Sequence, residues 1–165
     1  MNPRLSSTFH LTLPTDREIQ ISRQFAAPRR LIFQVMSQPE HLAHWWGPRS
    51  LQLVICEVDF RVGGGYRYVL RSPAGQEFGF RGEYREIVTD QKVVSTFEFD
   101  GAVGHGSLET MTLHEQLGMT TLTVRCLYRC SEDRDAHLNS GMESGARESH
   151  DRLEILIDSL QVPQS

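Results

Sequence analysis

Two periodicities alternate over the first third of the chain. Residues 17–25 place every second side chain, Arg23 among them, on one largely apolar face, which predicts a strand with that face against a core. An apolar stripe at helical spacing then predicts a helix that begins at Pro28, because a proline loses no hydrogen bond at the first helical position. A second short helix is predicted over residues 39–45, where a Gly-Pro pair soon ends it.

From residue 51 to residue 129 the pattern is that of strands. Alternating segments predict strands over residues 51–60, 66–71, 77–88, 92–99, 108–116 and 120–129. The connections between them are short, so the strands must be antiparallel neighbours, since a parallel pair needs a crossover of about a dozen residues or more. Glycines at positions 63–65, 79 and 82 allow such a sheet to curve strongly.

The C-terminal segment returns to helical spacing. Apolar residues recur every three or four positions from Met142 to Leu160, and charged residues fill most of the other positions. A helix this long needs a broad apolar surface, which the predicted sheet can supply. We therefore predict an α+β helix-grip fold, with a curved antiparallel β-sheet of about six or seven strands around a long C-terminal helix and two short helices after the first strand. Residues 1–16 are predicted to be a flexible N-terminal arm, and residues 17–162 a single domain.

Composition and charge narrow the classes of function. The net charge of −4 and the isoelectric point near 6.0 argue against nucleic-acid binding and against docking on an anionic membrane. No stretch approaches the ~20 apolar residues of a membrane span, and the first residues lack the pattern of a signal peptide. The three cysteines are an odd number, unlike most secreted disulfide frameworks. We expect a cytoplasmic protein with no nucleic-acid or membrane partner.

Several short motifs, taken in order, resemble one protein family. They are FAAP at residues 25–28, PEHLAHWWGP at 39–48, DFRVGGGY at 59–66, GMESG at 141–145 and DRL at 151–153. With this order and spacing, residues 17–160 resemble the activator-of-Hsp90-ATPase C-terminal-domain family of the START/birch-pollen-allergen (SRPBCC) superfamily. The resemblance implies strands that grip the C-terminal helix with a cavity between them. It does not by itself imply work on a chaperone.

Apolar side chains at alternating strand positions and on the flanking helices are candidates to line such a cavity. The candidate lining residues are Trp45, Trp46, Tyr66, Tyr68, Phe78, Phe80, Tyr84, Phe97, Met111, Leu113, Leu122, Val124, Met142 and Ala146. The same residues are compatible with a filled core, which is the default of close packing, and it is the resemblance that favours a pocket. We expect the pocket to open near the tryptophan pair and the loop at residues 100–106, and to hold an apolar or amphipathic small molecule.

The charged and metal-binding residue types point to no catalytic residue, metal or cofactor. Arginines and carboxylates on the strands are interpreted as ion pairs on the solvated face of the sheet. His41 and His44 are three residues apart on a helix, but no third ligand follows at a fitting spacing. Cys126 and Cys130 lack the second pair of a zinc site.

Two other functions remain alternatives to ligand binding. The first is an enzyme of the polyketide cyclase or dehydratase kind, which the superfamily includes. It requires ionisable groups inside the pocket, and Glu57, Asp59 and Tyr84 are the candidates. The second is a protein interaction, either as a co-chaperone or through self-association as a homodimer, and it predicts a large exposed apolar patch.

Overall fold

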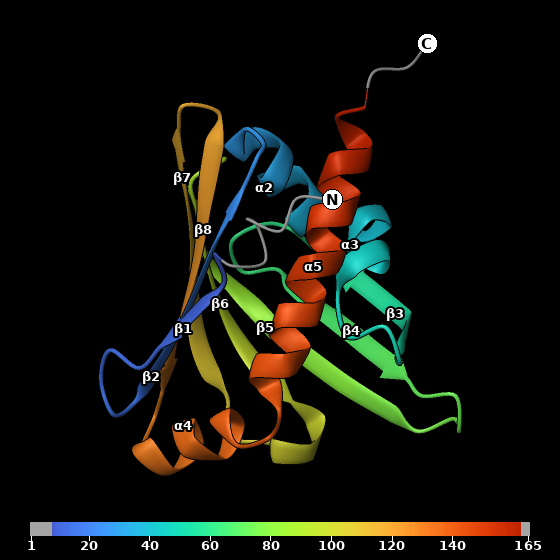
Figure 1. The fold of residues 1–165 in the computed structure, drawn as a ribbon. Coiled ribbons are helices and arrows are strands. Elements are labelled where there is room, and N and C mark those ends of the chain that lie inside the picture. The colour runs from blue at the N-terminus through green and yellow to red at the C-terminus, as the bar shows by residue number, and fades with distance from the viewer. Residues whose placement is uncertain (1–7, 163–165) are drawn as a thin grey trace.

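A computed structural model describes residues 8–162, and Figure 1 shows a curved sheet with one long helix against it. The elements in chain order are β1 (His10–Thr12), β2 (Glu18–Phe25), α2 (Arg29–Ser37), α3 (Pro39–Trp45), β3 (Gln52–Val58), β4 (Gly65–Arg71), β5 (Glu77–Val88), β6 (Lys92–Phe99), the 3₁₀ turn η1 (Asp100–Ala102), β7 (Ser107–Gln116), β8 (Met119–Tyr128), α4 (Ser131–Leu138) and α5 (Met142–Leu160). The predicted helix-grip fold is confirmed.

The strands form one eight-stranded antiparallel sheet in the order β1-β2-β8-β7-β6-β5-β4-β3. From β3 to β8 it is a meander, while β2 pairs along its whole length with β8, so that early and late parts of the chain meet. Gly82 lies opposite Tyr66 in the β4–β5 pair. A Cβ there would lie 2.0 Å from the Thr96 carbonyl oxygen and 2.4 Å from the Tyr66 ring, so this close approach requires glycine.

The sheet has one more strand than the sequence predicts, and the difference lies in the expected N-terminal arm. His10–Thr12 pairs with β2, and the neighbouring Phe9 is buried with its ring 5.5 Å from that of His150. Three residues are too few to show a period, which is why the pattern did not reveal β1. Residues 1–7 of the predicted arm lie outside the described residues. The polar helix α4 was not predicted either.

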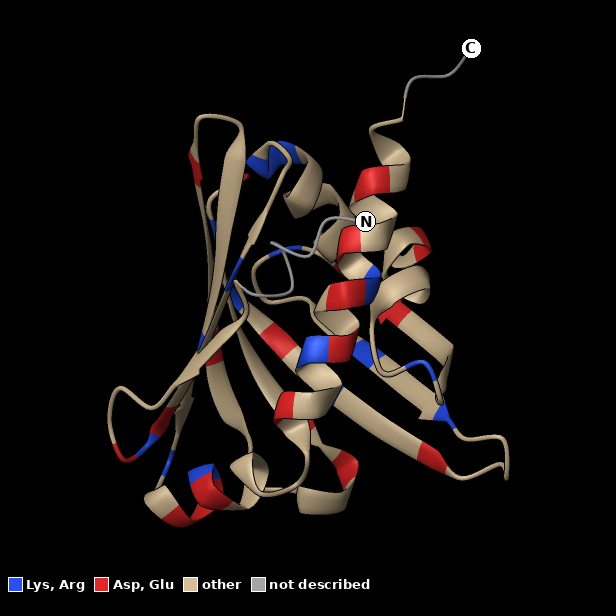
Figure 2. Ribbon diagram, viewed as in Figure 1, with Lys and Arg blue, Asp and Glu red and all other residues tan. Residues whose placement is uncertain are grey.

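The long helix α5 lies on the concave side of the sheet, as expected (Figure 1). In its C-terminal half Leu153 and Ile157 are fully buried. A buried arginine fastens the helix to β2: Arg23 donates a hydrogen bond of 2.7 Å to Asp151 and a second one to Glu154. Charged residues recur along the whole of α5 (Figure 2). Alternation predicts that Arg23 lies on the inner face of this strand, and the structure shows it there in a buried ion pair with α5.

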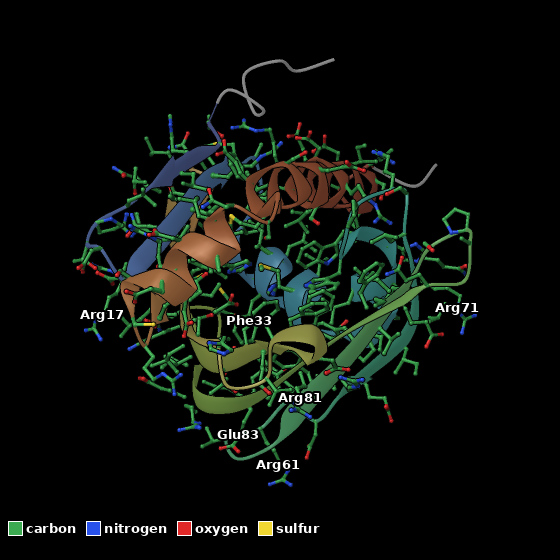
Figure 3. The ribbon with its side chains drawn as sticks, turned by 90° about the horizontal axis from the view of Figure 1, so that it is seen from below. Arg17, Phe33, Arg61, Arg71, Arg81 and Glu83 are labelled. Carbon is green, nitrogen blue, oxygen red and sulfur yellow. The ribbon has the colours of Figure 1, made fainter. Side chains whose placement is uncertain are left out.

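The outer face of the sheet carries the ion pairs that the strand pattern predicts. Arg81 on β5 lies 2.7 Å from Glu98 on β6. In Figure 3 the side chains of Arg71, Arg81 and Glu83 point away from the interior, whereas Phe33 lies inside. These exposed pairs leave the inner face to apolar side chains and to the site described next.

Candidate ligand-binding site

A cavity of about 360 Å³ separates the inner face of the sheet from the N-terminal half of α5. Strands β2, β4, β5, β6, β7 and β8 supply its floor, and α2, α3 and α4 contribute to its walls. On the α5 side the lining residues are Met142, Gly145, Ala146, Ser149 and His150. The helix therefore packs tightly through its second half and faces open space through its first.

Aromatic rings form much of the wall, and Trp46 lies at their centre. Its ring centroid is 4.7 Å from that of Tyr68 and 5.2 Å from that of Phe80, which in turn stacks on Phe97 at 5.5 Å. Trp46 follows α3 directly, and hydrogen bonds tie the next residue, Gly47, to α5 through Ser149 and Arg152. The position of Trp46 is therefore set by the contact between the α3 end and α5.

The two tryptophans serve different purposes. Trp45 is buried, and its indole N–H donates a 2.9 Å hydrogen bond to the carbonyl oxygen of Val35 in α2. Trp46 is half-buried and presents its ring to the other aromatics. Trp45 therefore packs toward α2 at the edge of the cavity, while Trp46, in extended backbone just after α3, packs its ring against the other aromatics of the wall.

Most of the candidate lining residues from the sequence do border the cavity. They are Trp45, Trp46, Tyr66, Tyr68, Phe80, Tyr84, Phe97, Met111, Val124, Met142 and Ala146. Phe78, Leu113 and Leu122 do not, and neither does the loop at residues 100–106. Leu113 and Leu122 face each other on β7 and β8, where α2 covers the sheet, and Phe78 lies toward the β4–β5 turn. Contact between any of these residues and a ligand stays a prediction.

Sequence reasoning missed several polar groups on the cavity wall, among them the carboxyl of Glu109. Glu109 lies on β7 two residues before Met111, so the alternation of that strand already places it on the inner face. Burial raises its pKa from the ordinary 4.5 to about 7. It is half-buried and forms no ion pair among the described residues. A carboxyl with this pKa changes its charge near neutral pH.

The neighbours of Glu109 are weakly polar and uncharged. The Cys126 thiol on β8 donates a 3.5 Å hydrogen bond to its Oε2, and burial holds the pKa of that thiol well above its ordinary value. Farther along β8 the Tyr128 hydroxyl hydrogen-bonds Nδ1 of His137 on α4. Burial raises the pKa of Tyr128 and lowers that of His137, so both are neutral at pH 7.

A second histidine borders the cavity from α5. His150 is buried with its ring edge-on to those of Phe9 and Phe25, and its Nδ1 has no hydrogen-bond partner among the described residues. Burial, reinforced by the nearby positive charge of Arg23, lowers its pKa to about 4. His150 is therefore neutral at physiological pH and adds no positive charge to the site.

The candidates for acid–base chemistry are not brought together. Glu57 and Asp59 are exposed, and Tyr84 borders the cavity with its pKa raised by burial to about 12. Over residues 8–162 no three side chains of His, Cys, Asp or Glu gather as a metal site would require. Within the same residues no helix combines the length and apolar character needed to cross a membrane.

Comparison with known proteins gives a consistent result. Residues 26–158 match the sequence profile of the family described as Activator of Hsp90 ATPase homolog 1-like protein. Among solved structures, a Rhodobacter sphaeroides protein superposes with a TM-score of 0.86 at 23% identity, over 93% of this chain and 100% of that one. The AHSA1 protein of Silicibacter pomeroyi superposes with a TM-score of 0.73 at 23% identity, over 87% of this chain and 99% of that one. No curated protein matches the chain.

Proposed function

The chain belongs to the Activator of Hsp90 ATPase homolog 1-like family, and from this premise we propose that it binds an apolar or amphipathic small molecule in the cavity between the sheet and α5. The observation that carries the proposal is the cavity itself. Close packing normally leaves no voids in a protein interior much larger than a water molecule. The cavity between the sheet and α5 has a volume of about 360 Å³. A space of that volume lies within the range of small-molecule sites.

The chemistry of the wall supports the same conclusion. Ligand sites are mostly apolar with a few placed polar groups, and here the aromatic rings around Trp46 accompany one carboxyl, that of Glu109. Each methylene group buried against such a wall contributes about 0.8 kcal/mol, so a medium-sized apolar ligand gains enough for micromolar binding. We expect the polar groups to set orientation and the rings to supply most of the affinity.

Gly145 offers a way to test this without removing any core side chain. It lies on the α5 wall of the cavity, and a Cβ added there meets no atom within 4 Å. Gly145→Leu should place a large side chain in the open space and weaken binding of a neutral fluorescent probe, N-phenyl-1-naphthylamine, at least tenfold. Ser144→Leu, one position away on the exposed side of the helix, is the matched control and should bind as the wild type does.

Native mass spectrometry of freshly purified protein complements the probe. A co-purified small molecule, present in the wild type and in Ser144→Leu but absent from Gly145→Leu, is the expected result. Probe binding that is equal in all three proteins would refute a site in this cavity. Circular dichroism of both variants checks that the fold is retained.

A second candidate function, acid–base catalysis on the bound molecule, rests on Glu109. A carboxyl whose pKa is raised to about 7 is matched to proton transfer at neutral pH. Catalysis predicts that the extracted ligand changes mass or isomer on incubation with the wild type and not with Glu109→Gln. Identical recovery of the ligand from both incubations would leave binding alone.

A further inference from the structure

We propose that the cavity selects an organic amine, with its ammonium group beside the Glu109 carboxylate and its apolar body against the rings around Trp46. The proposal rests on the ligand-binding function above and names the class of ligand. Three features of the site carry it: the sign of its charge, the nature of its walls and the unused bonding capacity of Glu109.

The charged side chains of the cavity wall carry only negative charge among the described residues. The described residues that line it include one carboxylate, Glu109, and no lysine or arginine. The two histidines of the wall, His137 and His150, both have their pKa lowered by burial and carry no charge at neutral pH. A negatively charged ligand, such as a fatty acid, would thus meet no cation in this wall and would be repelled by Glu109. A cationic ligand meets a charge of the opposite sign.

The walls also suit a cation. Four aromatic rings that border the cavity form a chain of contacts, with 4.7 to 5.5 Å between the centroids of each ring and the next: Tyr68, Trp46, Phe80 and Phe97. The faces of aromatic rings carry partial negative charge and attract ammonium groups and the polarised methylenes next to them, by about 0.5 to 2 kcal/mol for each well-placed ring. These rings can therefore stabilise both the ammonium group and the apolar body of a bound amine.

Glu109 retains bonding capacity that a donor group can fill. Among the described residues the Cys126 thiol is its one side-chain donor, through Oε2, and sulfur is a weak donor. A carboxylate accepts about four hydrogen bonds, so most of its capacity faces the cavity unused. An ammonium group brings up to three N–H donors and a positive charge, and such charge-assisted hydrogen bonds are about twice as strong as neutral ones.

The other titratable groups around Glu109 are mostly uncharged at pH 6.5 and above. Cys126 and Tyr128 face it from β8 and Tyr66 faces it from β4, and burial raises the pKa of all three. The two histidines on α4 and α5 have their pKa lowered, as described above. Between pH 6.5 and pH 7.5 the affinity for an amine should therefore follow the ionisation of Glu109 and rise about threefold.

The test uses three probes that share one apolar body: 6-phenylhexylamine, 6-phenylhexan-1-ol and 6-phenylhexanoic acid. Isothermal titration calorimetry at pH 7.5 should show the amine binding at least tenfold more tightly than the alcohol, and the acid more weakly than either. Glu109→Gln should reduce amine affinity at least tenfold and alter alcohol affinity less than threefold. Glu83→Gln removes one charge from the outer face and is the matched control, with affinities equal to those of the wild type.

Two results would overturn the amine assignment. One is an alcohol or acid that binds as tightly as the amine, and the other is an amine affinity that neither Glu109→Gln nor pH changes. In both cases the cavity would remain a binding site, which the neutral probe and the Gly145→Leu variant test separately. If none of the three compounds binds while the neutral probe does, the amine assignment fails and the proposed function stands. If the neutral probe also fails to bind, both are refuted.

Discussion

Replacing Glu109 with glutamine should stabilise the protein, and increasingly so as the pH rises. The carboxyl faces the cavity with one weak donor, and burial raises its pKa from 4.5 in an ordinary setting to about 7. The unfolded chain therefore gives up this proton at a lower pH than the folded chain does. The contribution of Glu109 to stability is intact below pH 4.5 and is lost as the pH rises through 7. Glutamine keeps the shape and cannot ionise.

The size of the effect follows from the pKa difference. One pKa unit corresponds to about 1.4 kcal/mol, so the shift from 4.5 to about 7 sets an upper bound of about 3 kcal/mol. Water in the half-open cavity screens part of this cost, so we expect about 2 kcal/mol. The free energy of unfolding of Glu109→Gln, relative to the wild type, should thus increase by about 2 kcal/mol between pH 5 and pH 8.

Urea unfolding followed by tryptophan fluorescence at pH 5, 6, 7 and 8 measures this difference directly. Glu83→Gln removes an exposed carboxylate from the outer face and should change the free energy of unfolding by less than about 1 kcal/mol. A Glu109→Gln difference that stays constant over this range would refute the reasoning, because it would mean that Glu109 ionises as freely in the folded protein as in the unfolded one.

Three further predictions concern stability. Arg23→Met should lower the free energy of unfolding by about 2 to 3 kcal/mol in urea titrations, because it removes two charge-assisted hydrogen bonds that join β2 to α5. Arg81→Met on the outer face should cost less than about 1 kcal/mol. The unfolded chain protonates His150 at a higher pH than the folded chain does, so the histidine favours unfolding as the pH falls from 6.5 to 4. His150→Phe should therefore lose less stability than the wild type over this range, and equal losses in both proteins would contradict this. Gly82→Ala should lower the melting temperature, because a Cβ there overlaps Thr96 and Tyr66. Gly145→Ala should raise the melting temperature through about 0.5 to 1 kcal/mol of helix propensity, and two shifts of the same sign would be inconsistent with the packing.

Side-chain direction was predictable from the sequence even for residues that break the apolar pattern. Alternation along β2 placed Arg23 on the inner face, and the structure buries it there against α5. The same alternation along β7 places Glu109 beside Met111, so the signal for the missed carboxyl was present. Charged strand residues are usually solvated, so only those that share a face with apolar neighbours indicate a buried carboxyl.

Alternation did not show which inner-face side chains border the cavity and which pack into the core. Met111 and Leu113 share a face of β7, yet Met111 borders the cavity and Leu113 is buried in the hydrophobic core. Likewise Val124 borders the cavity while Leu122 is fully buried. The difference depends on where α2 and α5 cross the sheet, and those crossings join segments far apart in the chain.

Period-two and helical spacing in the sequence indicated most strands and helices and the inner face of the sheet, because these spacings are local properties of the backbone. The resemblance of the short motifs indicated the family. Tertiary contacts set three further properties: α5 leaves open space along its first half, the Trp46 ring packs among the other aromatics of that space, and Glu109 is desolvated enough to hold its proton near neutral pH. Volume and desolvation depend on every element that surrounds a point, and no local pattern records them.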